Sequence, residues 1–299
     1  MSIVEKAAEI LKASRSEPQV SPPIAPALDP MSPPHSVPTI QRLMEQRGRS
    51  EDQPVEAAPL WHMDQMALQR MGFLPANGDG ERRLADEMRR IKRPLLANVN
   101  GKGVKVLAHA ERIVVTSAGP GEGKSFTAVN LALSLAREPD FEVLLVDGDI
   151  AKSNITRAFG LAGRAGLMDV LADERRPPAE VIVRTDVPNL LVVPAGEPRA
   201  LIGELFGSRR MEAVLEVFAG RNSRRLVVFD SSPLLATSEA QVLASYMGQV
   251  VVVVAAGRTR QQALNSSLQS LSDSQYVGLI LNMSHLPASE NHYDCGYGY

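Results

Sequence analysis

The sequence predicts a three-layer α/β fold, a mostly parallel sheet between two layers of helices, preceded by a proline-rich N-terminal arm. From about residue 81, short apolar and β-branched runs alternate with amphipathic stretches of helical length. Nearly continuous apolar strands separated by helices are typical of a parallel sheet covered on both faces. Prolines, in contrast, gather near the N-terminus, where eight of the 21 lie between Pro18 and Pro38.

The N-terminal arm divides into two predicted parts. Residues 1–14 contain a short amphipathic helix, since Ser2 and Glu5 have the spacing of a capping box. This helix either docks on a partner through its apolar face or frays in solvent. Residues 15–80 are predicted to form a disordered linker with polyproline II character, and the segment around Trp61 could hold a short helix.

The globular domain is predicted over residues 81–287. Its first helix carries Leu84, Met88 and Ile91 on one face, and Pro94 is expected to end or kink it. Six strands are predicted, at 112–117, 142–147, 189–196, 225–230, 249–256 and 276–282. Helical patterns lie between most of them, at 124–137, 200–219, 237–246 and 260–272.

Composition excludes several classes of function. The net charge is −2 and the isoelectric point about 6.2, so no basic bias indicates nucleic acid as a partner. The only cysteine, Cys295, rules out an internal disulfide and fits a reducing compartment. No apolar run approaches the ~20 residues that span a bilayer, and the N-terminus lacks the pattern of a secretory signal. We therefore expect a cytoplasmic location.

A glycine-rich loop follows the first predicted strand. Residues 118–125, AGPGEGKS, match the Walker A spacing except for Ala118, where glycine is commonest. Its glycines allow a tight turn whose N–H groups face phosphate oxygens, at a helix N-terminus that favours an anion. Lys124 can reach the β- and γ-phosphates, and the Ser125 hydroxyl can bind Mg²⁺. The predicted ATP-binding residues here are Gly119, Pro120, Gly121, Glu122, Gly123, Lys124, Ser125 and Phe126.

Three aspartates stand at the ends of two predicted strands. Asp147 and Asp149 close the run at 142–147, and Asp230 ends the run at 225–230. Ligands of open parallel sheets bind beyond the carboxyl ends of the strands, so these carboxylates should converge on the phosphate loop. Asp230 would anchor Mg²⁺ through water, whereas Asp147 and Asp149 would help to hold metal or accept a proton from an attacking hydroxyl. The alternative is a solvated strand end or a helix cap. The candidate catalytic residues are Lys124, Asp147 and Asp149, and the candidate metal ligands are Ser125, Asp147 and Asp230.

With these motifs, residues 81–299 resemble the bacterial tyrosine kinases, which are P-loop ATPases related to the MinD/ParA group. AGPGEGKS is similar to their Walker A motif, VLLVDGDIAKS to their second acidic motif, and LVVFDSSP to their Walker B motif. The resemblance implies an enzyme that uses ATP and Mg²⁺ to phosphorylate tyrosines in its own C-terminal cluster. It also implies that Asn282 contacts adenine; the other interpretation of Asn282 is a turn residue at a strand end.

More narrowly, the chain resembles the soluble tyrosine autokinases of exosortase and exopolysaccharide gene clusters. That resemblance implies activation by a separate membrane chain-length-determinant protein, which would recruit the kinase to the inner face of the plasma membrane. The wider resemblance to the bacterial tyrosine kinases implies a homo-oligomeric ring, whose interface in relatives carries the pattern E-x-x-R-x-x-R that Glu87, Arg90 and Arg93 match. Without the resemblance, these three residues would indicate a solvated helix with weak i,i+3 pairs.

The sequence departs from the related patterns at three places. Gly119 stands where MinD/ParA ATPases carry a lysine, which favours the kinase over its main alternative, an ATPase that acts as a localisation or assembly switch. Ala151 replaces a frequent arginine of the second acidic motif, and Ser232 replaces a frequent proline of the Walker B motif. A regulatory module that binds nucleotide without turnover is a further alternative, which the intact Lys124 argues against.

The C-terminal tail, residues 288–299, collects tyrosine. Three of the five tyrosines in the chain lie in its last seven residues, at Tyr293, Tyr297 and Tyr299. The surrounding glycines and polar residues leave these rings without packing partners, so the tail is predicted to be flexible. Incidental clustering, a sticky aromatic patch and a redox role of Cys295 are the other interpretations. We expect the three tyrosines to be autophosphorylation sites, each adding about −1.5 to −2 charges.

Overall fold

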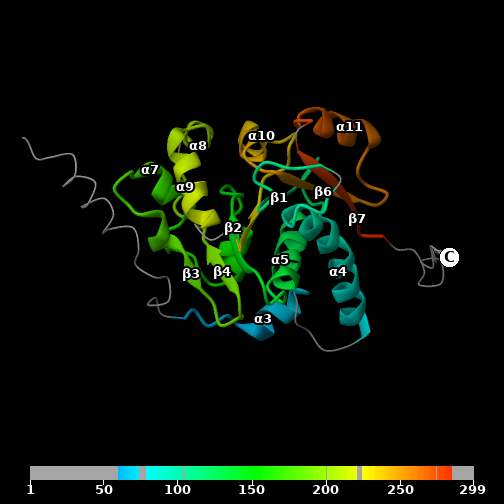
Figure 1. Ribbon diagram of the computed structural model, residues 1–299, viewed down its shortest axis with the longest axis horizontal. Coiled ribbons are helices and arrows are strands. Elements are labelled where there is room, and N and C mark those ends of the chain that lie inside the picture. The colour runs from blue at the N-terminus through cyan, green and yellow to red at the C-terminus, as the bar shows by residue number, and fades with distance from the viewer. Residues whose placement is uncertain are drawn as a thin grey trace, which may run out of the picture. The chain divides into compact units, whose positions relative to one another are not determined.

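A seven-stranded sheet forms the centre of the protein (Figure 1). The computed structural model describes residues 60–73, 79–103, 105–199, 201–220, 224–273 and 275–284. In spatial order the strands are β3 (Val183–Arg184), β4 (Leu190–Val193), β2 (Glu142–Asp147), β5 (Arg225–Asp230), β1 (Arg112–Ser117), β6 (Gln249–Ala255) and β7 (Tyr276–Asn282). All neighbouring strands are parallel except β3 and β4, so the predicted mostly parallel sheet is confirmed.

Helices cover both faces of the sheet and complete the three predicted layers (Figure 1). The first core lies under α7 (Leu167–Ala172), the 3₁₀ helix η2 (Pro178–Val181), α8 (Ile202–Phe206), α9 (Arg209–Ala219), α10 (Ser238–Ser245) and α11 (Gln261–Gln269). The second core lies under α3 (Gln65–Arg70), α4 (Asp79–Val99), α5 (Lys124–Leu135) and α6 (Asn154–Ala158). Side chains of β1 alternate between the cores, Val114 entering the first and Val115 the second. Burial on both faces explains why β1, β2, β4, β5 and β6 are mainly apolar, whereas β7, at the edge of the sheet, is partly exposed.

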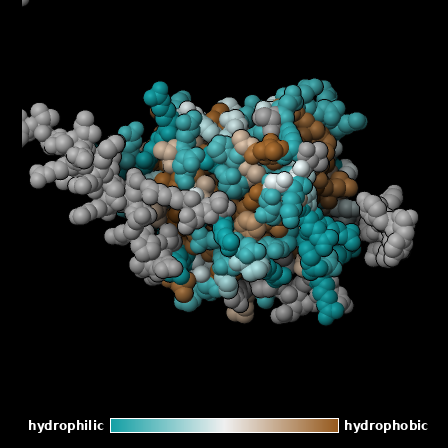
Figure 2. Space-filling model, in the orientation of Figure 1, coloured by the Kyte–Doolittle hydropathy of each residue, from teal (hydrophilic) through white to brown (hydrophobic). Residues whose placement is uncertain are grey.

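The face in Figure 2 is mainly hydrophilic, and apolar side chains gather toward the edge where β7 lies in Figure 1. On this edge strand Leu279 and Leu281 are 54% and 62% exposed. Among the helices that the structure describes, none combines the length and the apolar character needed to cross a membrane.

Most predicted elements keep their positions. Four strands match the predicted residues, β6 ends one residue earlier, and β4 covers only the middle of 189–196. Two helices, α8 and α9, replace the single helix predicted over 200–219. Gly207 caps the end of α8, and the Ser208 hydroxyl caps α9 by accepting from the Met211 N–H at 3.3 Å. The two-residue β3 was not predicted, because it is too short to leave a pattern.

Pro94 does not end α4, which continues to Val99. The proline is exposed, whereas the helix is anchored to the core on both sides of it. Lys92 donates to the Ser134 carbonyl at 2.7 Å, and Asn98 donates to the Gln249 side chain at 2.8 Å. These tertiary bonds offset the local cost of proline inside a helix.

Residues 60–73 pack against the domain, so the folded part begins earlier than the predicted residue 81. Trp61 forms a parallel bridge with Thr185 next to β3, and Leu68 is buried in the second core. The bridge joins residues 124 positions apart, which no local pattern reveals. The predicted helix at 1–14, the rest of the linker before residue 60, and the tail at 288–299 lie outside the described residues.

Candidate active site

The phosphate loop predicted from the sequence lies between β1 and α5. Gly121 and Gly123 have positive φ angles of 75° and 95°, a region that side chains disfavour. A Cβ on Gly123 would lie 2.1 Å from Nδ2 of Asn282, so a larger residue would collide there. Helix α5 begins at Lys124, directly after the loop. A tight loop at a helix N-terminus suits an anion such as a phosphate.

Glu122 and Asn282 brace this loop from within the protein. The buried Glu122 carboxylate accepts from the Gly119 N–H through Oε2 at 2.8 Å, and from the Thr259 hydroxyl through Oε1. Nδ2 of Asn282 donates to the Glu122 carbonyl at 2.9 Å. Both residues were predicted to contact ATP. Their side chains here bond the loop and the β6–α11 connection, so they fix the shape of the phosphate cradle.

The three predicted carboxylates come together beside Lys124. Strands β2 and β5 are neighbours, and Asp147 pairs in register with Asp230. Nζ of Lys124 lies 3.1 Å from Oδ2 of Asp149, and both side chains are buried. Asp147 and Asp230 are also shielded from solvent. One lysine thus offsets part of the charge of three buried acids.

Asp147 and Asp149 are oriented by different neighbours. Oδ2 of Asp147 accepts from both the N–H and the hydroxyl of Thr156 in α6, at 2.8 and 2.7 Å. Burial raises the pKa of Asp147, and the Thr156 hydrogen bonds oppose that rise. Oδ1 of Asp149 accepts from the Ser232 hydroxyl at 2.9 Å. Each carboxylate therefore keeps a fixed orientation toward the loop.

Asp230 is the most strongly perturbed of the three acids. Burial raises its pKa to about 8, and the nearby Ser125 hydroxyl offsets part of the rise. Within the part of the chain described, neither Asp230 oxygen nor Oδ1 of Asp147 accepts a well-oriented hydrogen bond. Buried carboxylate oxygens that lack donors are costly, and a hard cation would satisfy them.

These oxygens fit a Mg²⁺ ion that is bound together with a nucleotide. The described residues contain no cluster of three His, Cys, Asp or Glu side chains that could hold a metal by themselves. At phosphate-transfer sites Mg²⁺ uses one or two carboxylates, and waters and substrate phosphates complete its shell. Ser125, Asp147 and Asp230 could supply the protein's share of such a shell.

A hollow of about 390 Å³ lies against the outside of the phosphate loop. The loop residues Gly119, Pro120 and Glu122 line it, together with Arg258. Nη2 of Arg258 lies 3.6 Å from the place that a Cβ on Gly121 would take. The volume is within the usual range of ligand sites, so the hollow could take a group that continues outward from bound phosphates.

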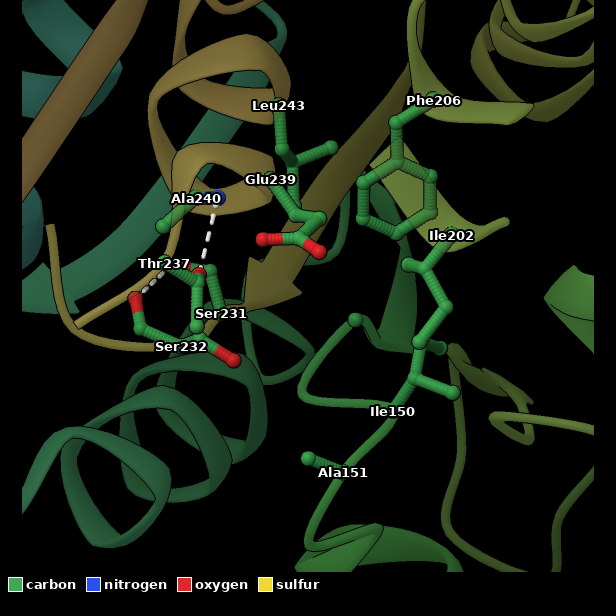
Figure 3. A pocket seen from close by; sticks show the side chains of 11 residues that line it. Ile150, Ala151, Ile202, Phe206, Ser231, Ser232, Thr237, Glu239, Ala240 and Leu243 are labelled. Carbon is green, nitrogen blue, oxygen red and sulfur yellow. Dashed lines mark hydrogen bonds between the residues drawn. The ribbon is translucent and has the colours of Figure 1, made fainter. Parts of the chain in front are cut away.

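A smaller hollow of about 60 Å³ lies between the ends of β2 and β5 and the helices α8 and α10 (Figure 3). Apolar side chains form much of its wall, and the Glu239 carboxylate projects between Ser232 and Phe206. Its volume falls below the range of ligand sites. It is therefore too small for a nucleotide. One of its lining residues, Ser232, donates a hydrogen bond to Asp149 and so helps to hold that carboxylate in place.

The other predicted site residues are not brought to this centre. Glu87, Arg90 and Arg93 are exposed on α4, and Glu87 accepts from Nε of Arg83 at 3.0 Å. This exposure agrees with an interface and equally with a solvated helix face. Tyr293, Tyr297 and Tyr299 lie outside the described residues. Their predicted roles stay predictions.

Two site residues escaped the sequence analysis. Thr156 holds Asp147, and Thr259 holds Glu122. Thr259 follows β6 at the carboxyl edge of the sheet. Ligands of parallel sheets bind at this edge, so its position in the sequence could have marked it as a candidate. Thr156 lies nine residues beyond Asp147 on a helix too short to recognise from its pattern.

The fold and this site define a P-loop protein of the nucleoside-triphosphate-binding kind. The family model described as AAA domain matches residues 110–274, more than half of the chain. Tyrosine-protein kinase CpsD of Streptococcus agalactiae is 32% identical over 190 residues, which cover 61% of this chain and 77% of CpsD. The chain therefore belongs to the AAA domain family and, within it, to the bacterial tyrosine-protein kinases.

Two further proteins are similar to this chain, and one of them is a kinase domain. The succinoglycan biosynthesis transport protein ExoP of Rhizobium meliloti is 34% identical over 179 residues, which cover 58% of this chain but only 22% of ExoP. The crystal structure of the VpsO kinase domain superposes with a TM-score of 0.57 at 29% identity. That match covers 70% of this chain and 100% of the VpsO chain.

Proposed function

We propose that this protein is an ATP-dependent protein-tyrosine kinase that phosphorylates Tyr293, Tyr297 and Tyr299 of its own tail. The observation that carries the proposal is the buried ion pair of Lys124 with Asp149 at the phosphate loop. Membership of the tyrosine-protein kinase family supports this chemistry over ATP hydrolysis alone.

The reaction moves one phosphoryl group. The phenolic oxygen of a tyrosine bonds to the γ-phosphorus, the bond from this phosphorus to the β–γ bridging oxygen breaks, and ADP leaves. Lys124 and the loop N–H groups hold the phosphates, and Asp149 or Asp147 accepts the phenolic proton. Bound Mg²⁺, held through Ser125 and Asp230, would neutralise phosphate charge.

The setting that we propose is exopolysaccharide biosynthesis or export. The similarity to a succinoglycan biosynthesis transport protein supports it. In this proposal a separate membrane chain-length-determinant protein activates the kinase at the inner face of the plasma membrane. Subunits assemble into a ring through Glu87, Arg90 and Arg93, and each presents its tail to a neighbour.

Incubation with Mg²⁺-ATP followed by mass spectrometry tests the kinase. Wild type should gain phosphate on the tail when the cytoplasmic segment of a chain-length-determinant protein is present, and less phosphate without it. Lys124→Met should gain none, and replacing the three tail tyrosines by phenylalanine should abolish the signal. Tyr246→Phe, which changes a tyrosine inside the domain, is the matched control and should leave the signal unchanged. Phosphate release without phosphotyrosine would instead support the ATPase alternative.

A further inference from the structure

Residues 60–73 form a strap along the second core, from the edge strand β3 to the first turn of α5. Its Met63, Leu68 and Phe73 side chains are buried in this core. Helix α3, which lies within the strap, stands on the same side of the sheet as α4 and α5 (Figure 1). The strap therefore contacts the layer of the domain that carries the phosphate loop helix.

The first end of the strap extends the sheet by one bridge. The Trp61 N–H donates to the Arg184 carbonyl at 2.7 Å, and the Asp186 N–H donates to the Trp61 carbonyl at 3.1 Å. The Met63 N–H donates to Oδ1 of Asp186 at 3.2 Å. Three hydrogen bonds thus hold this end at the edge beside β3.

The indole of Trp61 reaches from this edge to the end of α6. Its Nε1–H donates to the Phe159 carbonyl at 2.9 Å, and the Arg164 guanidinium lies 5.0 Å above the ring. Phe159 caps α6, the helix whose Thr156 donates both hydrogen bonds to Asp147. One short helix thus connects the strap to a candidate catalytic carboxylate.

The second end of the strap lies against the phosphate loop helix. The ring of Phe73 is 6.0 Å from the ring of Phe126, centroid to centroid. Gly72 approaches the same ring so closely that a Cβ on it would lie 3.2 Å from Phe126. Phe126 follows Lys124 and Ser125 in the first turn of α5. Packing at Phe126 therefore bears on the position of the groups that hold phosphate and Mg²⁺.

We propose that the strap is a positioning element whose two ends act on different steps of the reaction. Trp61 fixes α6 and thereby the orientation of Asp147, which serves the chemical step. Phe73 fixes the first turn of α5 and thereby the nucleotide-binding groups. The effect on turnover rests on the proposed kinase function, whereas the effect on nucleotide affinity does not.

Conservative variants of the full chain separate this role from simple covering of the core. Trp61→Phe keeps a ring and removes the Nε1–H donor, and Phe73→Leu keeps an apolar side chain and removes the ring contact. Met66→Ala is the control within the strap, because Met66 is 71% exposed. Urea unfolding of each variant establishes that it is folded before kinetics are measured.

The two ends should give different signatures. Trp61→Phe should lower kcat for phosphotyrosine formation by about tenfold, because misplacing a catalytic group mainly affects the chemical step. It should leave the Kd of a fluorescent ATP analogue, measured in EDTA so that the metal-binding role of Asp147 does not enter, within about twofold. Phe73→Leu should raise that Kd about fivefold, the scale of one weakened hydrogen bond. Met66→Ala should match wild type in both.

Two results would overturn the proposal. One is wild-type kcat and Kd in both folded variants, which would leave the strap as a cover of the core. The other is the same change in the same parameter at both ends. A wild-type chain that binds the analogue but forms no phosphotyrosine would refute the kinase function alone. The Kd of Phe73→Leu would then decide whether the strap positions the nucleotide-binding groups.

Discussion

Asp230→Asn should stabilise the nucleotide-free protein although it removes a candidate metal ligand. Asp230 is fully buried, and its pKa is raised from 3.8 to about 8, first of all by burial. Between these two values the folded state keeps a proton that the unfolded state has released. The stability that this retained proton gives to the folded state is therefore fully present below pH 3.8 and is lost as the pH rises toward about 8.

The size of the effect follows from the two pKa values. One pH unit corresponds to 1.36 kcal/mol, so the interval from 3.8 to about 8 amounts to roughly 6 kcal/mol of stability lost with rising pH. Asparagine has the shape of the protonated acid and does not titrate. The gain from Asp230→Asn should thus be near zero at pH 4 and about 3 to 5 kcal/mol at pH 8.

Urea unfolding in EDTA between pH 4 and pH 8 measures this gain. Asp140→Asn is the control, since Asp140 is 78% exposed and its ion pair with Arg224 is 3.8 Å long. That control should change stability by less than about 0.5 kcal/mol at any pH. Addition of Mg²⁺-ATP at a hundred times its Kd should stabilise wild type by about 2.7 kcal/mol and Asp230→Asn by much less.

Two results would refute burial of an unpaired Asp230 carboxylate: an Asp230→Asn variant that is no more stable than wild type at pH 8, or a gain in stability that does not grow with pH. Either result would mean that the carboxylate is solvated or paired in solution. Equal stabilisation of both proteins by Mg²⁺-ATP would contradict the role of Asp230 as a metal ligand, whatever its effect on stability.

Three further changes test the rest of the site. Thr156→Val removes a hydroxyl donor from Asp147, so the pKa of Asp147 should rise further. The acid limb of the pH–kcat profile should then move to higher pH. An acid limb that does not move would exclude Asp147 as the base. Thr259→Val removes the hydroxyl that donates to Glu122 and should weaken binding of a fluorescent ATP analogue about fivefold. It should also lower the free energy of unfolding in urea by about 1 kcal/mol, because the buried Glu122 carboxylate loses a donor; unchanged binding would show that the loop keeps its shape without this bond. Gly148→Ala places a Cβ 2.7 Å from a backbone oxygen of β5 and should cost about 1 to 3 kcal/mol in urea unfolding; a neutral result would show that the strand ends can separate.

The parts of the fold that follow from local rules could be predicted from the sequence. Strands buried on both faces read as apolar runs, so the six parallel strands were found close to their observed positions. The meeting of Asp147 with Asp230 also followed, because the carboxyl ends of parallel strands share one edge. Neither prediction required knowledge of which strands are neighbours.

The parts that depend on distant contacts could not be predicted. Trp61 pairs with Thr185 and bonds to Phe159, and nothing around Trp61 in the sequence identifies these partners. The continuation of α4 through Pro94 is a second example, since bonds from Lys92 to α5 outweigh the local preference. The support of the phosphate loop by Glu122 belongs to the same class, because its acceptor role depends on a hydroxyl more than 130 residues away.

Burial links the stability of this protein to its chemistry. Four ionisable side chains, those of Lys124, Asp147, Asp149 and Asp230, share a site that excludes water, and three carboxylates face one lysine. In such surroundings Asp147 and Asp230 resist ionisation, as their raised pKa values reflect. A nucleotide with its cation would bring charge of both signs to the same place, where low polarity strengthens each interaction. The folded protein is thus least stable without ligand, and binding of the nucleotide with its cation would offset the destabilisation that these buried charges cause.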